Sequence, residues 1–214
     1  MSNLTLIIGD KNLSSWSLRP WLMLKQAGVA FAERTIRLDQ PSTRKEVTAV
    51  SPSGLVPCLD HDGLLIWDSL AIGEYLAETF PDKKLWPEER PARARARSVA
   101  AEMHSGFAEL RKVWPMNFTR IGMAHLCPVG VKRDIDRIAA IWTECRQEFG
   151  AGGPFLFGGF SIADAMYAPV ISRFMTYGPV TLPGPAADYM AMMFALPAMR
   201  EWGEGAAEQI AFPG

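Results

Sequence analysis

The sequence predicts two parts, a small α/β domain followed by an all-helical domain. In the first 80 residues, short apolar runs typical of strands alternate with helix-like segments. A polar, proline-marked stretch follows at residues 81–90, and beyond it strand-like runs nearly vanish. With 214 residues, 49% of them hydrophobic, the chain has enough apolar material for a core in both parts. We therefore expect domains at residues 1–80 and 91–214, joined by a linker at 81–90.

The first part begins with a strand and a helix, and this pair is then repeated. Residues 4–9 form a short apolar run rich in residues that favour strands, and residues 18–28 form a helical pattern that ends in glycine. Residues 30–36 alternate between apolar and polar, which indicates a second strand. A serine opens residues 42–50 and a glutamate follows near the capping-box position, which predicts a short second helix.

A hairpin and a third helix complete the first part. Residues 56–60 and 63–67 are short strands joined by an Asp-Gly turn, and residues 69–80 form a helix that Pro81 ends. The resulting order is βαβαββα. Because a helix joins the first two strands, they should run parallel, whereas the hairpin strands run antiparallel. The pattern predicts a mixed sheet of four strands with three helices, which is a thioredoxin-like α/β domain.

Helix-like spacing dominates the second part. Two apolar stripes follow steps of three and four residues, which place their members on one face of a helix. The first stripe contains Val99, Met103, Phe107, Leu110 and Trp114, and the second contains Val131, Ile135, Ile138, Trp142, Cys145 and Phe149. Further helices are expected at the sequences FSIADAMYAP and LPAMREWGEGAAEQI, so we predict an all-α domain.

Composition argues against several classes of function. The net charge is −1, with no basic excess that would indicate a nucleic acid or an anionic membrane as a partner. The first apolar run is too short to span a bilayer, and no basic segment precedes it, so we expect a cytoplasmic protein. The three cysteines and three histidines are scattered without metal-ligand spacing, so we expect reduced thiols and no metal site.

Serines at the expected start of the first helix raise two alternatives. Ser14, Ser15 and Ser17 follow the first strand, where a helix N-terminus presents unpaired N–H groups and a partial positive charge. Serine hydroxyls favour helix caps, and capping is the first alternative. A hydroxyl at this place can also donate a hydrogen bond to a thiolate and so lower the pKa of the thiol.

Two further positions offer groups that bind a peptide. Pro57 begins an expected strand, and a cis bond after Val56 would turn the polar backbone groups of Val56 out of the sheet. Asp68 and Ser69 precede an amphipathic helix, where they can serve as caps. Alternatively, Ser69 and the helix N–H groups bind a carboxylate while Asp68 pairs with an ammonium, as an α-amino acid end requires.

The combination of SSWSLRPW, SPSGLVPCL and DSLAIGEYL, followed by a helical half, resembles the cytosolic glutathione transferase superfamily. The resemblance covers nearly the whole chain. It is to the serine-type classes and nearest to the zeta class, some of whose members isomerise maleylacetoacetate. The sequence SIADAMYAP adds to it, because Ser161 and Asp164 match a capping box in the family's helical domain. In the zeta motif SSCS, a cysteine stands where this chain has Trp16.

By this resemblance, Ser14 matches the serine that stabilises the thiolate of glutathione, the expected co-substrate, and Ser15 is the next candidate for that role. The resemblance also implies that the first helix of the second domain lines the site of an electrophilic second substrate. The candidate residues for that site are Trp16, His104, Phe107, Arg111 and Trp114. Arg111 stands at about the place of a zeta-class glutamine, which favours a more acidic substrate.

The same resemblance assigns the peptide contacts. Val56, which precedes Pro57, matches the residue that pairs with the cysteinyl backbone of glutathione. Asp68 and Ser69 match the pair that holds the γ-glutamyl group, and Gln40 is a candidate for the glycine end.

The function implied by the resemblance is that of a glutathione transferase, a homodimer as is usual in the family, that conjugates glutathione to a small electrophile. Two alternatives stay open. One is a glutathione-dependent cis–trans isomerase of the maleylacetoacetate type, in which the thiolate adds and then leaves. The other is a non-catalytic binding module that keeps the fold and binds a partner.

Overall fold

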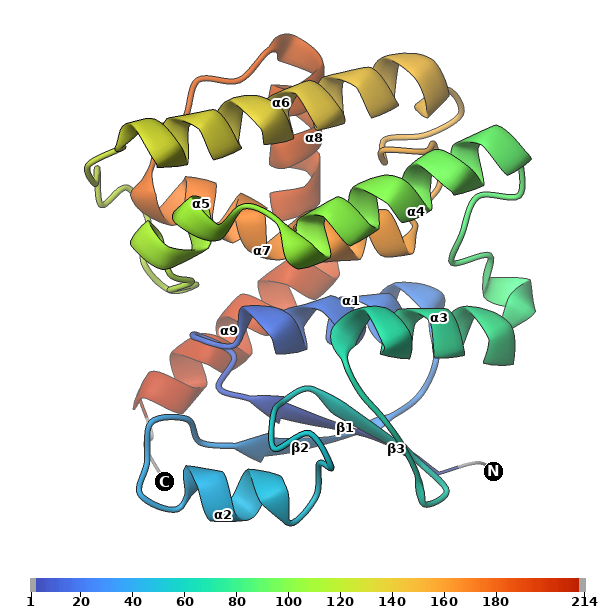
Figure 1. Ribbon diagram of the computed structural model, residues 1–214, viewed down its shortest axis with the longest axis vertical. Helices are drawn as coiled ribbons and strands as arrows, with labels where there is room; N and C mark the ends of the chain where they lie inside the picture. Colours follow the sequence, from blue (N-terminus) through green and yellow to red (C-terminus); the bar gives the residue numbers. More distant parts are fainter. Residues whose placement is uncertain (1–2, 212–214) are drawn as a thin grey trace.

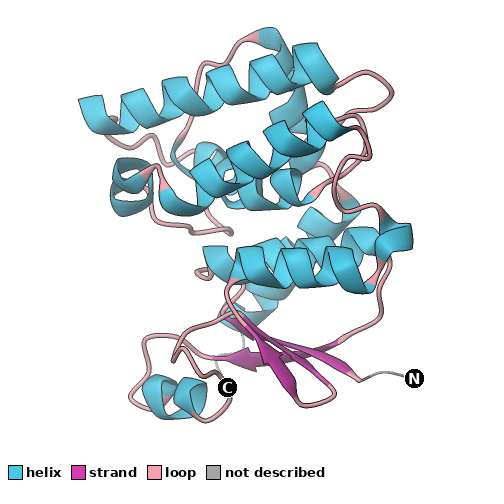
Figure 2. Ribbon diagram, turned by 45° about the vertical axis from the view of Figure 1, so that its right-hand side comes forward, coloured by secondary structure: helices cyan, strands magenta, loops and turns pink. Residues whose placement is uncertain are grey.

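The computed structural model describes residues 3–211 and has a sheet in its first part and helices throughout the second (Figure 1). The strands are β1 (Leu4–Gly9), β2 (Ala32–Ile36), β3 (Cys58–His61) and β4 (Leu64–Ile66), in the order β2-β1-β3-β4. β1 and β2 run parallel, and the pairs β1–β3 and β3–β4 run antiparallel. Figure 2 shows the strands gathered at one end of the molecule. The predicted thioredoxin-like sheet is confirmed.

Helices cover both faces of this sheet. α1 (Ser15–Ala27) and α3 (Ser69–Thr79) lie on one face, and α2 (Thr43–Thr48) lies on the other (Figure 1). α1 begins three residues earlier than the apolar pattern predicts, because its first turn is made of polar and half-buried residues. It ends as predicted at Gly28, whose φ of 63° is a left-handed conformation that glycine adopts without strain.

Side chains of β1 alternate between the two faces of the sheet. Leu6 and Ile8 belong to the main core, whereas Ile7 packs in a smaller cluster with Val47 of α2 and Cys58. Burial raises the pKa of the Cys58 thiol, which makes this residue a core element rather than a nucleophile.

The second part is helical, as predicted. Its helices are α4 (Arg90–Ser105), α5 (Ala108–Val113), α6 (Val129–Phe149), α7 (Ile162–Tyr177), α8 (Gly184–Phe194) and α9 (Pro197–Ala211). α7 is buried along almost its whole length and packs against both α1 and α4. α9 returns to the first part and lies beside α1 (Figure 1). One main core therefore runs through both parts of the chain.

The first apolar stripe of the second part does not form one helix. α4 ends at Ser105, Phe107 has a φ of 58°, and α5 starts at the next residue. The spacing of apolar residues continues across this break, since Phe107 and Leu110 are both buried in the same core. The prediction of a single long helix was therefore wrong, although its buried face was right.

The expected linker is packed against both neighbours. It contains a single 3₁₀ turn, Pro81–Lys83, and its Leu85 carbonyl accepts a hydrogen bond of 2.9 Å from the Ile162 N–H of α7. Trp86 Nε1 donates to Glu74 of α3 over 3.0 Å. The domain limits themselves stay a prediction. Within residues 3–211, no helix is long and apolar enough to cross a membrane.

Candidate functional site

A cavity of about 330 Å³ lies between the first part of the chain and α4. It is lined by Trp16, Ser53, Leu55, Val56, Pro57, Trp67, Asp68, Ser69 and His104. Six of these residues were candidates from the sequence, drawn from three separate motifs and from α4. Ser53, Leu55 and Trp67 were missed. Leu55 and Trp67 are exposed apolar residues at the rim, a feature that often marks a binding site.

The start of α3 presents one carboxylate and one hydroxyl to this cavity. Asp68 Oδ1 accepts hydrogen bonds from the N–H groups of Leu70 and Ala71, at 2.9 and 3.3 Å, and so caps the helix. Asp68 Oδ2 lies 3.0 Å from Nε2 of His104 on α4. The capping alternative is therefore correct for one oxygen of Asp68, while the other oxygen reaches across to the helical part.

Ser69 has a different environment from Asp68. Its side chain is fully buried, yet Ser69 Oγ has no hydrogen-bond partner among residues 3–211. A buried hydroxyl without a partner costs free energy, about 1–3 kcal/mol, unless another group fills its hydrogen-bonding capacity. An acceptor such as a carboxylate oxygen, placed in the cavity at the N-terminus of α3, fits this hydroxyl.

Ser14 lies at the N-terminus of α1, but its side chain makes no capping bond in the described chain. Ser14 Oγ donates to Ser17 Oγ over 2.7 Å, and Ser17 Oγ accepts from the Gly9 N–H over 3.1 Å. Ser14 is 6% exposed and does not line the cavity, whereas Trp16, two residues further along, does. Ser15 is half-buried at the first position of α1.

The Val56–Pro57 peptide bond is cis, as the resemblance implies. β3 begins only at Cys58, because proline has no N–H to donate to the sheet. Both Val56 and Pro57 line the cavity.

Trp16 lies between the cavity and two arginines, the buried Arg19 and the half-buried Arg111. The guanidinium groups of Arg19 and Arg111 lie 4.1 and 5.1 Å from the centre of its ring, and His104 meets the ring edge-on. Burial lowers the pKa of Arg19 well below its usual value, and the charges of Arg111 and Arg173 lower that pKa further. Arg19 was missed from the sequence, although it lies one turn after Ser15 on the same helix.

Arg111 stabilises the backbone near the break between α4 and α5. One of its terminal nitrogens donates to the carbonyl of Met103 at 3.1 Å and to that of His104 at 2.9 Å, and also to the carbonyl of Gly106. Burial lowers the pKa of the Arg111 guanidinium. This side chain is thus occupied by the turn that it stabilises, instead of extending freely into the cavity.

The remaining candidates lie elsewhere. Phe107 and Trp114 are buried in the main core, and Trp114 stacks on Tyr177. Gln40 lines two other cavities, one of about 740 Å³ beside the loop after β2 and one of about 630 Å³ that it shares with Ser53. Its side-chain nitrogen lies 3.5 Å from the Leu38 carbonyl. Among residues 3–211, no group of three or more His, Cys, Asp or Glu side chains is placed to hold a metal ion.

Two family models match the chain. The model of the glutathione S-transferase N-terminal domain matches residues 13–79, and that of the C-terminal domain matches residues 128–202. The chain belongs to the glutathione transferase superfamily. The first match contains the Ser14, Val56 and Asp68 positions, so all three motifs lie inside the N-terminal family domain.

Curated relatives place this glutathione transferase family member near the zeta class. It is 35% identical over 99 residues to a probable maleylacetoacetate isomerase of Caenorhabditis elegans, a match that covers 46% of this chain and 45% of that protein. It is 29% identical over 162 residues to the maleylacetoacetate isomerase of Rattus norvegicus, which covers 74% and 72% of the two chains. The chain thus spans under half of the length of the first relative and nearly three quarters of the second.

Solved structures agree on the fold. A glutathione transferase homologue from Burkholderia, solved with bound glutathione, matches 96% of this chain and 99% of its own, with a TM-score of 0.72 and 23% identity. An unclassified glutathione S-transferase from Bombyx mori matches 96% and 94%, with a TM-score of 0.76 and 17% identity. At such low identity the likeness concerns the fold alone.

Proposed function

We propose that this protein is a glutathione transferase that binds glutathione in the 330 Å³ cavity and activates its thiol for attack on a small electrophile. The observation that supports this most is the pair at the start of α3. Asp68 keeps one carboxylate oxygen turned toward His104, and the buried Ser69 hydroxyl lacks a partner in the described chain. Together they match the ammonium and carboxylate of an amino acid end.

The residues that line the cavity suggest which groups bind each part of glutathione. The α-carboxylate of the γ-glutamyl group binds Ser69 and the N-terminus of α3, and its ammonium pairs with Asp68, which His104 holds in place. The polar backbone groups of Val56 pair with the cysteinyl unit. Gln40 does not line this cavity, but it shares a neighbouring cavity with Ser53, so we assign the glycine end to Ser53, the remaining polar residue of the lining.

Thiol activation requires the hydrogen bond between Ser14 and Ser17 to change direction. Because a hydroxyl both donates and accepts, Ser17 can reverse the 2.7 Å bond and donate to Ser14, which then donates to the thiolate. The N-terminus of α1 adds a partial positive charge. Both effects favour the thiolate and lower the pKa of the thiol. The thiolate then forms a bond to the electrophile, and Ser14 is the group that we assign to its stabilisation.

Ser69 provides the test of the peptide site. Calorimetric titration of reduced glutathione into wild-type protein should show saturable binding, and Ser69→Ala should weaken it at least about tenfold, since a hydrogen bond to a charged group is lost. Ser98→Ala is the matched control, because the Ser98 hydroxyl bonds the Ala94 carbonyl on the exposed face of α4. Wild-type protein that takes up no glutathione would refute the proposed function.

Isomerisation of maleylacetoacetate is the second candidate, favoured by the names of the curated relatives. Conjugation of apolar electrophiles is favoured by the lining, in which Trp16, Leu55 and Trp67 are prominent. Trp16 also covers the guanidinium group of Arg19, whose Nε and Nη1 have no partner in the described chain and would otherwise attract an acidic substrate.

Trp16 should therefore determine whether the protein prefers maleylacetoacetate or an apolar electrophile. We expect Trp16→Cys to raise the kcat/KM for maleylacetoacetate by about tenfold or more, relative to the kcat/KM for a neutral apolar electrophile. The reason is that the Arg19 guanidinium becomes able to bind a carboxylate of the substrate. The control is Trp67→Cys, which removes an indole from the same lining without a guanidinium contact in the described chain. An unchanged ratio in Trp16→Cys, or an equal change in both variants, would contradict this role.

We also propose a homodimer and a cytoplasmic location, as the family resemblance implies. The molecular mass in solution, measured by analytical ultracentrifugation, tests the first of these.

A further inference from the structure

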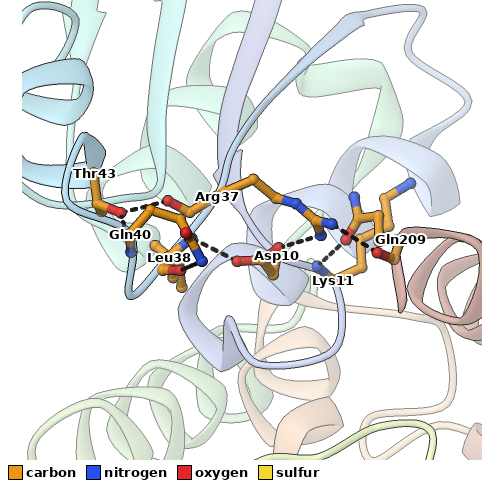
Figure 3. A network of polar contacts seen from close by, with 7 residues as sticks. All are labelled: Asp10, Lys11, Arg37, Leu38, Gln40, Thr43 and Gln209. Carbon is orange, nitrogen blue, oxygen red and sulfur yellow. Dashed lines mark hydrogen bonds and ion pairs between the residues drawn. The ribbon is translucent and has the colours of Figure 1, made fainter. Parts of the chain in front are cut away.

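The loop that carries Ser14 is built around one buried carboxylate. We define the serine loop as residues 10–14, between β1 and α1. The N–H groups of Leu13 and Ser14 donate to the Asp10 carbonyl at 3.1 and 2.8 Å. The Asp10 side chain, only 10% exposed, accepts from the Leu38 N–H at 2.6 Å and from Arg37 Nη1 at 2.7 Å (Figure 3). The loop after β2 therefore fixes one side of the serine loop.

The C-terminal helix fixes the other side. Gln209 Oε1 on α9 accepts from the Lys11 N–H over 2.8 Å, and Trp202 Nε1 on the same helix donates to the Lys11 carbonyl over 2.7 Å. Arg37 Nη2 donates to the Gln209 carbonyl over 2.7 Å, so the guanidinium joins Asp10 to α9 (Figure 3). Both backbone polar groups of Lys11 are thus bound by a helix almost two hundred residues further along the chain.

This arrangement has a physical reason. Residues 10–14 lie between a strand and a helix, so their backbone groups have no regular ladder to join and need partners from elsewhere. The end of α9 supplies an acceptor in the Gln209 side chain, and it gains a cation near its C-terminus, where the helix dipole favours positive charge. The two segments therefore stabilise one another.

We propose that Gln209 is a positioning residue for thiol activation: through Lys11 and Asp10, it holds the serine loop where the Ser14 hydroxyl can meet the glutathione thiolate. The inference rests on the proposed function of Ser14. Hydrogen-bond stabilisation depends on a correct approach of donor and acceptor, and a displacement of about 1 Å in a supporting residue can cost a large part of the rate. Loosening the loop should therefore weaken activation without removing the peptide site at α3.

The test compares Gln209→Ala with Gln209→Glu, which keeps a side-chain acceptor for the Lys11 N–H. Glu208→Ala is the control, since Glu208 is an exposed neighbour on α9. In Gln209→Ala, amide hydrogen exchange at Leu13 and Ser14 should be at least about threefold faster than in the wild type. The pKa of bound glutathione, read from thiolate absorption, should rise by roughly half a unit to one unit.

Two further measurements distinguish a positioning role of Gln209 from a general loss of structure in the variant. The affinity of Gln209→Ala for glutathione at low pH, where the thiol is neutral, should stay within about twofold of wild type, since the γ-glutamyl contacts lie at α3. Gln209→Glu should restore both exchange and thiol pKa. Unchanged exchange and unchanged thiol pKa in Gln209→Ala would overturn the inference, and so would faster exchange with an unchanged pKa. A wild-type protein that binds no glutathione refutes the proposed function instead, while the exchange measurement still tests the contact between Gln209 and the loop.

Discussion

Ser14→Ala should lower kcat/KM at pH 7 by about ten- to a hundredfold. The variant removes one hydrogen bond to a thiolate, and a bond to a charged group contributes roughly 1.5–3 kcal/mol. Each 1.36 kcal/mol changes a rate by about tenfold, which gives the expected range. The buried position of Ser14 beside Ser17 makes gross unfolding an unexpected result, because alanine fits the same space.

The pH dependence of this effect has a defined sign. Ser14 stabilises the charged form of the thiol, so its loss raises the pKa of bound glutathione and moves the rate profile to higher pH. The difference between variant and wild type should be largest below the wild-type pKa of the bound thiol and should shrink as pH rises. Steady-state kinetics across this range measure it. Turnover that is unchanged in Ser14→Ala would move the assignment to Ser15.

Asp164→Ala should lower the free energy of unfolding by about 3–5 kcal/mol, the range for breaking a buried polar network. The carboxylate accepts from the Leu156 N–H at 3.0 Å, from the Ser161 N–H at 2.8 Å and from Ser161 Oγ at 2.9 Å. The contact with the Ser161 N–H is part of the capping box predicted from the sequence at the start of α7. Because α7 packs on α1 and α4, its loss affects both parts. Denaturant titration measures the change, and a loss below about 1 kcal/mol would contradict it.

The same residue predicts a pH effect on stability. Burial raises the pKa of Asp164 to about 6 in the folded protein, against a usual value of 3.8. The folded state therefore holds the proton more tightly than the unfolded state. The stability that this proton contributes is fully present below about pH 4 and is lost as pH rises to about 6.

Asp164→Asn has no such titration and serves as the reference. The unfolding free energy of wild type relative to Asp164→Asn should fall by up to roughly 3 kcal/mol between these pH values and then stay level. An increase over the same range would mean that the hydrogen bonds to the carboxylate outweigh its burial.

Local patterns predicted the strands and most of the helices, although α8 was missed, and together with the family resemblance they named six of the nine residues that line the cavity. Ser14 and Asp68 were found because each stands where a helix begins after a strand, and this position has a physical meaning in any fold. Phe107 shows the limit of such patterns. Its apolar spacing continues across a break in the backbone, so periodicity alone cannot reveal that one helix has become two.

Residues in loops and contacts across the chain could not be predicted in this way. Gln40 was a candidate by the family resemblance alone, since loops have no periodicity that predicts the direction of a side chain. The surroundings of Arg19 depend on the packing of α7 against α1 and on the charges of Arg111 and Arg173, which local sequence patterns do not contain. The contact between Gln209 and Lys11 joins two segments whose neighbourhood depends on the complete fold.

The N-terminus of α1, with Ser14, is the part of the molecule that we propose stabilises a glutathione thiolate. The test is a titration of the thiolate absorption of glutathione bound to wild type and to Ser14→Ala. We predict that the wild type holds the pKa of the bound thiol below its free value and that Ser14→Ala moves the pKa back toward it. If the bound thiol in the wild type has the same pKa as free glutathione, Ser14 and the N-terminus of α1 do not stabilise the thiolate.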